Sequence, residues 1–236
     1  MAKTLVAHEQ PVAKIFSDDY VFRIPGYQRP YAWTTDQAEE LFDDLHTFMQ
    51  AAGGPVEEMP PYFLGSIVLI KEETAPEADV VDGQQRLTTL TILLATIRAS
   101  VTEPSASEVT RLIYEKGSAI LGTKDRFRLS LRERDSDFFQ IYIQKEDGVT
   151  KLLKLGEKLT DSQNNIRANA MLYMDRITKL PEAYRLRLAQ FAVTRCYLVV
   201  VATPGEEIRM LGSGGAQSAG QQNGNKQECT THGFPL

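Results

Sequence analysis

Cysteine is scarce in this chain of 236 residues, which contains only Cys196 and Cys229. Cys196 lies in an apolar run and Cys229 in a polar segment, so the pair has neither the spacing of a metal site nor that of a disulfide framework. A protein without stabilising disulfides is expected in a reducing compartment. We therefore predict a cytoplasmic location.

Long apolar runs and an excess of positive charge are also missing. No stretch approaches the roughly 18 apolar residues that a membrane helix needs, and residues 1–16 lack the apolar core of a signal peptide. The expected protein is soluble and unprocessed, with no membrane partner. Its formal net charge is -5, which argues against coating nucleic acid through bulk charge and leaves only focal contacts.

The first hundred residues alternate between strand and helix signals. β-branched and aromatic residues cluster where strands are expected, and apolar residues recur every three or four positions where helices are expected. Thr34 and Gln37 have the spacing of a capping box at a helix start. The pattern predicts a short helix or loop at 3–17, strands at 21–24, 62–71 and 80–81, and helices at 34–50 and 87–97.

After Pro104 the pattern becomes mainly helical. Helices are expected at 105–116, 135–144, 161–179 and 181–193, with strands at 126–131 and 197–203. We predict an α/β (α+β) fold with a small sheet domain at 1–103, a helical domain at 104–207 that is incomplete at its C-terminal end, and a flexible tail at 208–236. The tail is rich in Gly and Gln and poor in large apolar side chains, so it cannot bury enough surface to offset its ordering entropy. A strand followed by such a tail suggests a truncated chain.

The stretch from Ala78 to Ser100 is the strongest candidate for a binding site. A short strand runs through a polar turn into an amphipathic helix, so unpaired backbone N–H groups and the positive end of the helix dipole face outward. Arg86 adds a planar guanidinium suited to phosphate or carboxylate. The simpler alternative is a tight turn in which Arg86 pairs with a nearby carboxylate. The turn consists of Asp82, Gly83, Gln84, Gln85 and Arg86.

A second unusual stretch is IPGYQRPYAW, residues 24–33. Its prolines exclude a helix, and its aromatic rings need something to pack against. We expect Tyr31 and Trp33 to pack, as a plug over the sheet edge, while Gln28 and Arg29 face the site. Gly65 and Ser66, inside the strand expected at 62–71, indicate a bulge, close backbone approach to a ligand, or simple core packing.

The arginines between residues 126 and 134 favour a solvated basic face, with DNA contact as the alternative.

Three motifs occur together and in order: IPGYQRPYAW, YFLGSIVLI (62–70) and VVDGQQRLTTL (80–90). This combination resembles the prokaryotic family found at the N-terminus of GmrSD-type, modification-dependent (Type IV) restriction endonucleases. The resemblance covers about residues 10–204. It implies a ParB/sulfiredoxin-like nucleotide-binding domain followed by a helical domain. It also implies partners, namely a nucleotide, modified DNA and a nuclease domain or subunit.

The resemblance also implies roles for individual residues. Asp82, Gln85 and Arg86 would be catalytic in nucleoside-triphosphate (NTP) hydrolysis, with Asp82 also the candidate Mg²⁺ ligand. The nucleotide, whether ATP, GTP or CTP, would be bound by residues of both motifs, namely Tyr27, Gln28, Arg29, Gly83 and Gln84.

Several features leave the function open. Relatives continue into an asparagine-arginine-glycine segment and a nuclease domain that have no counterpart here, and His8, His46 and His232 are scattered. No nuclease activity is therefore expected from this chain alone. The leading hypothesis is an NTP-binding, NTP-hydrolysing sensor module of a phage-defence system. The alternatives are a non-catalytic DNA- or partner-binding module and an inactive truncated fragment.

Overall fold

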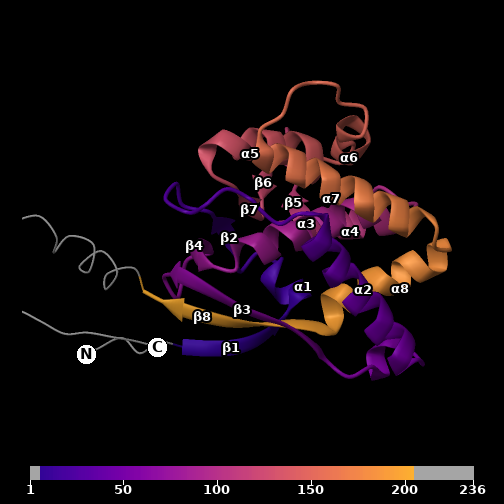
Figure 1. Cartoon of the computed structure of the whole chain (residues 1–236). Coiled ribbons are helices and arrows are strands. Elements are labelled where there is room, and N and C mark those ends of the chain that lie inside the picture. Colours follow the sequence, from indigo (N-terminus) through magenta and orange to yellow (C-terminus); the bar gives the residue numbers. More distant parts are fainter. Residues whose placement is uncertain (1–5, 205–236) are drawn as a thin grey trace, which may run out of the picture. The chain divides into compact units, whose positions relative to one another are not determined.

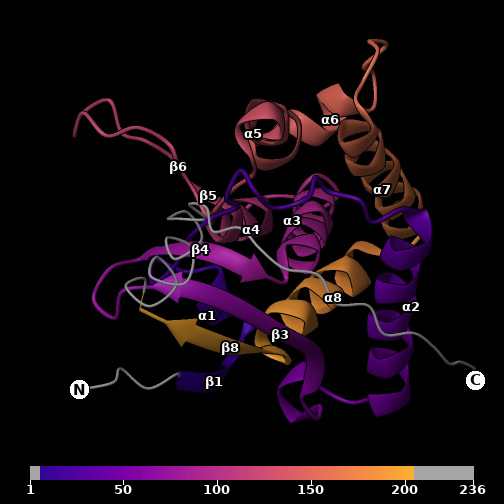
Figure 2. The ribbon, with the colours of Figure 1, turned by 60° about the vertical axis from the view of Figure 1, so that its left-hand side comes forward.

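The computed structural model describes residues 6–204, and strands from both ends of this range meet in one mixed sheet. The sheet has six strands in the order β1-β8-β3-β4-β2-β7 (Figures 1 and 2). A separate two-stranded ribbon pairs β5 with β6. The strands are β1 (Val6–Pro11), β2 (Val21–Arg23), β3 (Tyr62–Lys71), β4 (Glu77–Asp82), β5 (Tyr114–Glu115), β6 (Arg126–Phe127), β7 (Leu129–Ser130) and β8 (Cys196–Thr203).

Helices pack against this sheet, which confirms the predicted α/β class (Figure 2). The predicted capping box of Thr34 and Gln37 is formed at the start of α2. Thr160 and Gln163 form a second capping box, which was not predicted, at the start of α7. The helices are α1 (Val12–Ile15), α2 (Thr35–Ala52), α3 (Gln84–Arg98), α4 (Ser105–Ile113), α5 (Glu133–Phe139), α6 (Gly148–Leu152), α7 (Asp161–Thr178) and α8 (Glu182–Thr194), with a π turn at Gln140–Gln144 and a 3₁₀ turn at Val56–Glu58.

Helix α3 lies at the centre of the fold, between the sheet and the helices α4 and α7 (Figure 1). Every residue of α3 except Arg86 is buried. The expectation of an amphipathic helix with one apolar stripe is therefore wrong, because α3 is covered on all sides. Its buried threonines remain compatible with this position because their hydroxyls donate to carbonyls of the same helix, as Thr88 does to Gln84 at 2.8 Å.

Two further expectations are corrected by long-range pairing. The segment 3–17, expected as a helix or loop, contains the strand β1, which pairs antiparallel with β8. The single strand expected at 126–131 is split between two sheets. Between its halves, the Arg128 N–H donates to Ile113 and the Arg128 carbonyl accepts from Phe22. Neither partner is near in sequence, so local patterns could not reveal these pairings.

Strands from both sides of the predicted domain boundary share the main sheet. β7 and β8 follow residue 103, yet β7 pairs with β2 and β8 pairs with β3. The division into 1–103 and 104–207 stays a prediction, and the predicted tail at 208–236 lies outside the described residues. No helix within residues 6–204 has the length and apolar character needed to cross a membrane.

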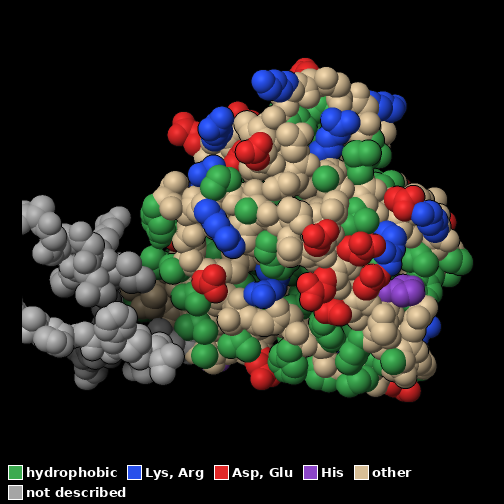
Figure 3. Space-filling view, in the orientation of Figure 1, with side chains coloured by type: hydrophobic (Ala, Val, Ile, Leu, Met, Phe, Trp, Pro, Cys, Tyr) green, Lys and Arg blue, Asp and Glu red, His purple; other side chains and the backbone are tan. Residues whose placement is uncertain are grey.

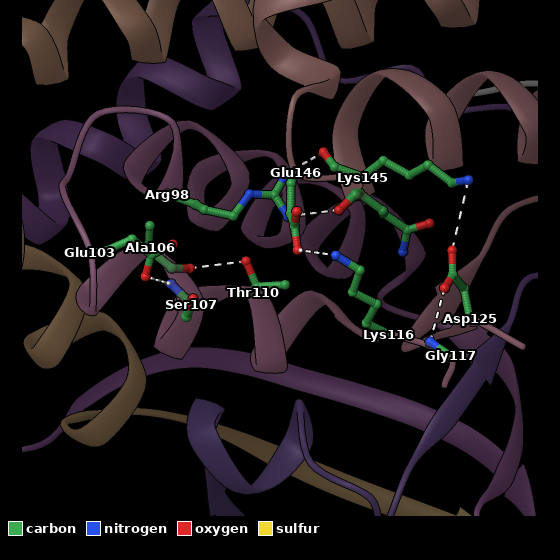
Figure 4. A network of polar contacts seen from close by, with 11 residues as sticks. Arg98, Glu103, Ala106, Ser107, Thr110, Lys116, Gly117, Asp125, Lys145 and Glu146 are labelled. Atoms are coloured by element: carbon green, nitrogen blue, oxygen red, sulfur yellow. Dashed lines mark hydrogen bonds and ion pairs between the residues drawn. The ribbon is translucent and has the colours of Figure 1, made fainter. Parts of the chain in front are cut away.

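A buried arginine fixes the C-terminal end of α3. The Arg98 guanidinium donates to the carbonyls of Ile143, Gln144 and Lys145 at 2.7 to 2.8 Å, and Figure 4 shows the side chain reaching toward Lys145. Within residues 6–204 it has no carboxylate partner at ion-pair distance. Burial lowers the pKa of Arg98 to about 10. Three consecutive carbonyls at the end of the π turn thus depend on one side chain.

Replacing Arg98 should therefore destabilise the protein strongly. Arg98→Met keeps most of the side-chain volume but leaves buried carbonyls without donors, and we expect a loss of roughly 3 kcal/mol in the free energy of unfolding. Urea denaturation followed by circular dichroism measures this loss. Arg111→Met, on the exposed face of α4, is the matched control and should change stability by less than about 0.5 kcal/mol. Equal effects of the two substitutions would contradict the assignment.

Candidate functional site

The two sequence motifs meet at a cavity of about 490 Å³, here called the α3 cavity. It opens where the 24–33 loop crosses the end of β4 and the start of α3. The residues at its wall include all the predicted site residues except Tyr27, which is 72% exposed and lies outside it. Trp33 was not predicted to face the site. The lining consists of Gln28, Arg29, Trp33, Asp82, Gly83, Gln84, Gln85 and Arg86.

The start of α3 provides the backbone donors of this cavity. Gly83 occupies the N-cap position with φ of 90°, and no side chain caps the helix. A Cβ atom on Gly83 would lie 2.5 Å from Cγ2 of Ile67 on β3, so glycine is required both by the left-handed conformation and by the close packing. The first-turn N–H groups of an uncapped helix are unpaired and carry the positive end of its dipole. The cavity is therefore suited to an anion.

Gln85 holds the 24–33 loop against α3. Its Oε1 accepts hydrogen bonds from the N–H groups of Ala32 and Trp33 at 2.8 and 3.2 Å, and its Nε2 donates to the Pro30 carbonyl at 3.1 Å. These three contacts occupy the carboxamide of a buried side chain. Gln85 thus positions the loop, and a catalytic role for it stays a prediction.

Two further glutamines, Gln28 and Gln84, link the loop to β4 and α3. Gln28 donates through Nε2 to the Val81 carbonyl at 2.8 Å, and Gln84 donates through Nε2 to Oε1 of Gln28 at 3.2 Å. Arg132, which follows β7, donates to the Gln28 backbone carbonyl at 3.4 Å. The loop is therefore tied to the sheet, to α3 and to the second half of the chain.

Arg86 lies across β3, where the strand carries an irregularity. Its Nη1 donates to the Ser66 carbonyl at 2.9 Å, and the register of β3 against β8 shifts between Phe63 and Ser66. A Cβ on Gly65, whose φ is 102°, would come within 3.1 Å of the guanidinium. The strand is thus irregular at Gly65, and the close approach to its backbone is made by Arg86.

The electrostatic setting of Arg86 differs from that of a paired surface arginine. Burial lowers its pKa, and the charge of Asp82 partly offsets this effect. Within residues 6–204, Arg86 has no carboxylate within the 4.0 Å of an ion pair. The alternative interpretation, a tight turn closed by a salt bridge of Arg86, is therefore not supported. The positive charge of Arg86 remains available to a ligand.

Tyr31 packs as expected, but against the helices α3 and α7. Tyr31 is 5% exposed, and its hydroxyl lies 2.7 Å from both Thr89 Oγ1 and Asn169 Nδ2. Burial raises the pKa of Tyr31 to about 12. Asn169 also donates to the Trp33 carbonyl at 3.0 Å, so α7 supports the loop from behind. No local sequence signal marks Asn169, because its partners are more than a hundred residues away.

The basic run at 126–134 is not one solvated face. Arg128 is 5% exposed, and both it and Arg126 pair with Asp18. Arg132 and Arg134 line a second cavity instead. The face shown in Figure 3 carries a group of acidic side chains over α2, where Arg176 bridges Glu39 and Asp43. This acidic group over α2 does not suit a DNA backbone.

Acidic groups are sparse in the α3 cavity, where Asp82 is the one carboxylate of the lining. The described part of the chain has no group of three or more His, Cys, Asp or Glu side chains placed to hold a metal. Asp82 alone cannot form a closed metal site. One carboxylate is nevertheless enough where phosphate oxygens and water complete the coordination of Mg²⁺.

Comparison with known families agrees with this arrangement of motifs. The model of the GmrSD restriction endonuclease N-terminal domain matches residues 12–212. The chain belongs to the GmrSD N-terminal domain family. No curated protein matches the sequence significantly. Membership makes the chain a restriction-system component, and the α3 cavity is formed by residues within the part that matches the GmrSD N-terminal domain.

Substitution of Gly83 tests whether the packing at the start of α3 shapes the cavity. Gly83→Ala places a Cβ in the left-handed region and against Ile67, and we expect a loss of at least roughly 2 kcal/mol in the free energy of unfolding. Gly156→Ala, where a Cβ would meet nothing within 4 Å and φ is not positive, is the control and should be nearly neutral. Both variants are compared by thermal unfolding. Equal Tm values would contradict the claim that Gly83 is required at this position.

Proposed function

We propose that the α3 cavity binds the phosphates of a nucleoside triphosphate and supports its hydrolysis. The observation that carries this proposal is the convergence of Arg29, Arg86 and the uncapped start of α3 on one cavity. Backbone donors at a helix N-terminus together with arginine guanidinium groups form a recurrent phosphate-binding arrangement. The volume of about 490 Å³ is in the range of small-molecule sites.

Each group has a distinct task in this proposal. The first-turn N–H groups of α3 hold phosphate oxygens, with Gly83 allowing the backbone to come close. Arg86, fixed by its bond to Ser66, directs its remaining N–H groups to the phosphates and stabilises charge that develops during transfer to water. Arg29 is exposed at the cavity wall and adds a second positive charge.

Asp82 is the group proposed to hold Mg²⁺ or to orient the attacking water. Its carboxylate is exposed and lines the same cavity as Arg86. When bound, Mg²⁺ would neutralise phosphate charge and act as a Lewis acid. The proposal for the chain as a whole is that nucleotide turnover regulates a nuclease domain or subunit in response to modified DNA, in keeping with its family.

The second candidate is a nucleotide- or DNA-binding module without turnover. It is favoured by Gln85, whose carboxamide is occupied by the loop backbone. Asp82 then remains the one lining side chain able to act as a base. Binding without phosphate release would support this candidate.

Phosphate release and ligand binding separate the two candidates. We expect wild-type protein to release phosphate from at least one of ATP, GTP and CTP in the presence of Mg²⁺. Nucleotide at 100 times its dissociation constant should stabilise the fold by about 2.7 kcal/mol, which is a shift of roughly 5–10 °C in Tm. Trp33, the single tryptophan, lines the cavity and should report binding by its fluorescence.

Arg86→Ala is the decisive variant. It should abolish phosphate release and weaken nucleotide binding by about 10-fold or more, because a charge-assisted hydrogen bond contributes on the order of 1.5–3 kcal/mol. Arg111→Ala removes an exposed arginine outside the cavity and should leave both quantities unchanged. Turnover that survives Arg86→Ala would rule out the assigned site, and an unchanged Tm with every nucleotide would rule out the proposal.

A further inference from the structure

A larger cavity of about 620 Å³, here called the α7 cavity, lies next to the α3 cavity. Arg29 lines both of them. The 24–33 loop forms one wall, and the segments around α5 and the start of α7 form the others. The lining residues are Arg29, Pro30, Tyr31, Ala32, Arg132, Arg134, Asp135, Lys158, Leu159, Thr160, Asp161, Ser162 and Asn165.

A third, small space of about 10 Å³ shares lining residues with both cavities. Its wall includes Gln84 and Gln85 from the α3 cavity and Arg132 and Asp135 from the α7 cavity, with Arg29 common to all three spaces. This volume is about that of one water molecule. This space is too small for a ligand. A ligand that occupies both cavities would therefore lie over Arg29, which lines both of them.

Two side-chain oxygen atoms of residues that line the α7 cavity are buried without hydrogen-bond partners. Asp135 is 2% exposed and Ser162 is 6% exposed, and neither Asp135 Oδ1 nor Ser162 Oγ has a hydrogen-bond partner within residues 6–204. Ser162 lies in the first turn of α7, a helix of 18 residues. The other oxygen of Asp135 is 3.4 Å from Arg132. Buried polar atoms normally have partners, and these two oxygens have hydrogen-bonding capacity left for a bound group.

The wall of the α7 cavity combines apolar surface with four basic and two acidic side chains. Pro30, Tyr31 and Leu159 provide apolar surface, while Asp135 and Asp161 provide carboxylates beside the basic side chains. A buried carboxylate oxygen repels phosphate but accepts hydrogen bonds from sugar hydroxyls or from the N–H groups of a base. Guanidinium groups can also stack on a base.

We infer that the α7 cavity holds the base and sugar of the nucleotide whose phosphates bind in the α3 cavity. This inference rests on the proposed function, because it extends the same ligand into a second space. Asp135 and Ser162 are the groups that contact the nucleoside. Arg29, at the junction, lies between its sugar and its phosphates. Nucleotide identity is then set by the α7 cavity, while the α3 cavity reads only phosphate.

The test compares a full nucleotide with inorganic tripolyphosphate, which carries phosphates but no nucleoside. Affinities are measured by isothermal titration with Trp33 fluorescence as a second readout. Wild type should bind the preferred NTP at least about 10-fold more tightly than tripolyphosphate. Ser162→Ala and Asp135→Asn should each weaken NTP binding by about 3- to 10-fold and leave tripolyphosphate binding unchanged, as loss of one hydrogen bond predicts.

Control variants distinguish a loss of binding from a loss of folding. Ser162 Oγ has no partner within the described range, so Ser162→Ala should keep the wild-type Tm, and Ser105→Ala at the start of α4 should affect neither ligand. Arg86→Ala should weaken both ligands. If Ser162→Ala and Asp135→Asn fold normally and bind NTP as wild type does, the inference is overturned while the proposed function stands.

Two other outcomes are also decisive. If neither NTP nor tripolyphosphate binds the wild type, the proposed function fails and the nucleoside site falls with it. Binding of a short single-stranded oligonucleotide is measured as a third comparison, beside NTP and tripolyphosphate. If the Asp135 and Ser162 variants lose oligonucleotide binding but keep NTP binding, the α7 cavity belongs to a DNA strand, and the nucleoside assignment is wrong.

Discussion

The burial of α3 on every side is the constraint on which the rest of the fold depends. Its N-terminal turn opens into the candidate phosphate site, and its C-terminal Arg98 closes the π turn at Gln140–Gln144. Only Arg86 escapes burial along its length. A helix packed against the sheet, α4 and α7 at once cannot shift without disturbing all of them, so its backbone donors are held in place before any ligand arrives.

Much of this arrangement could be predicted from local sequence. The capping box at Thr34 and the strand at 62–71 are signalled by nearby residues, and they are confirmed. β1 was missed because its partner β8 lies at the other end of the described chain. The meeting of the two motifs followed from a family resemblance. Local sequence pattern alone does not predict the contact between Gln28 and Gln84.

The supporting contacts of the site could not be predicted in the same way. Asn169 on α7 and Arg132 after β7 hold the 24–33 loop through bonds that span more than a hundred residues. Gln85 illustrates a different limit. Its place in the motif was clear, but its polar atoms contact the loop backbone, which only the three-dimensional arrangement reveals. Sequence identified the residues that line the cavity better than it identified their individual tasks.

The missing side chain at Gly65 has a mechanical consequence. Arg86 lies against β3 where that strand has no Cβ, and the same strand pairs in parallel with β8 on its other edge. The segment between Phe63 and Ser66 therefore contacts Arg86 and is also the place where the register of β3 against β8 shifts. Any side chain at residue 65 would therefore push the Arg86 guanidinium away from Ser66, the carbonyl that orients it in the cavity. The position of the site's central arginine thus depends on a residue of β3 that has no side chain at all.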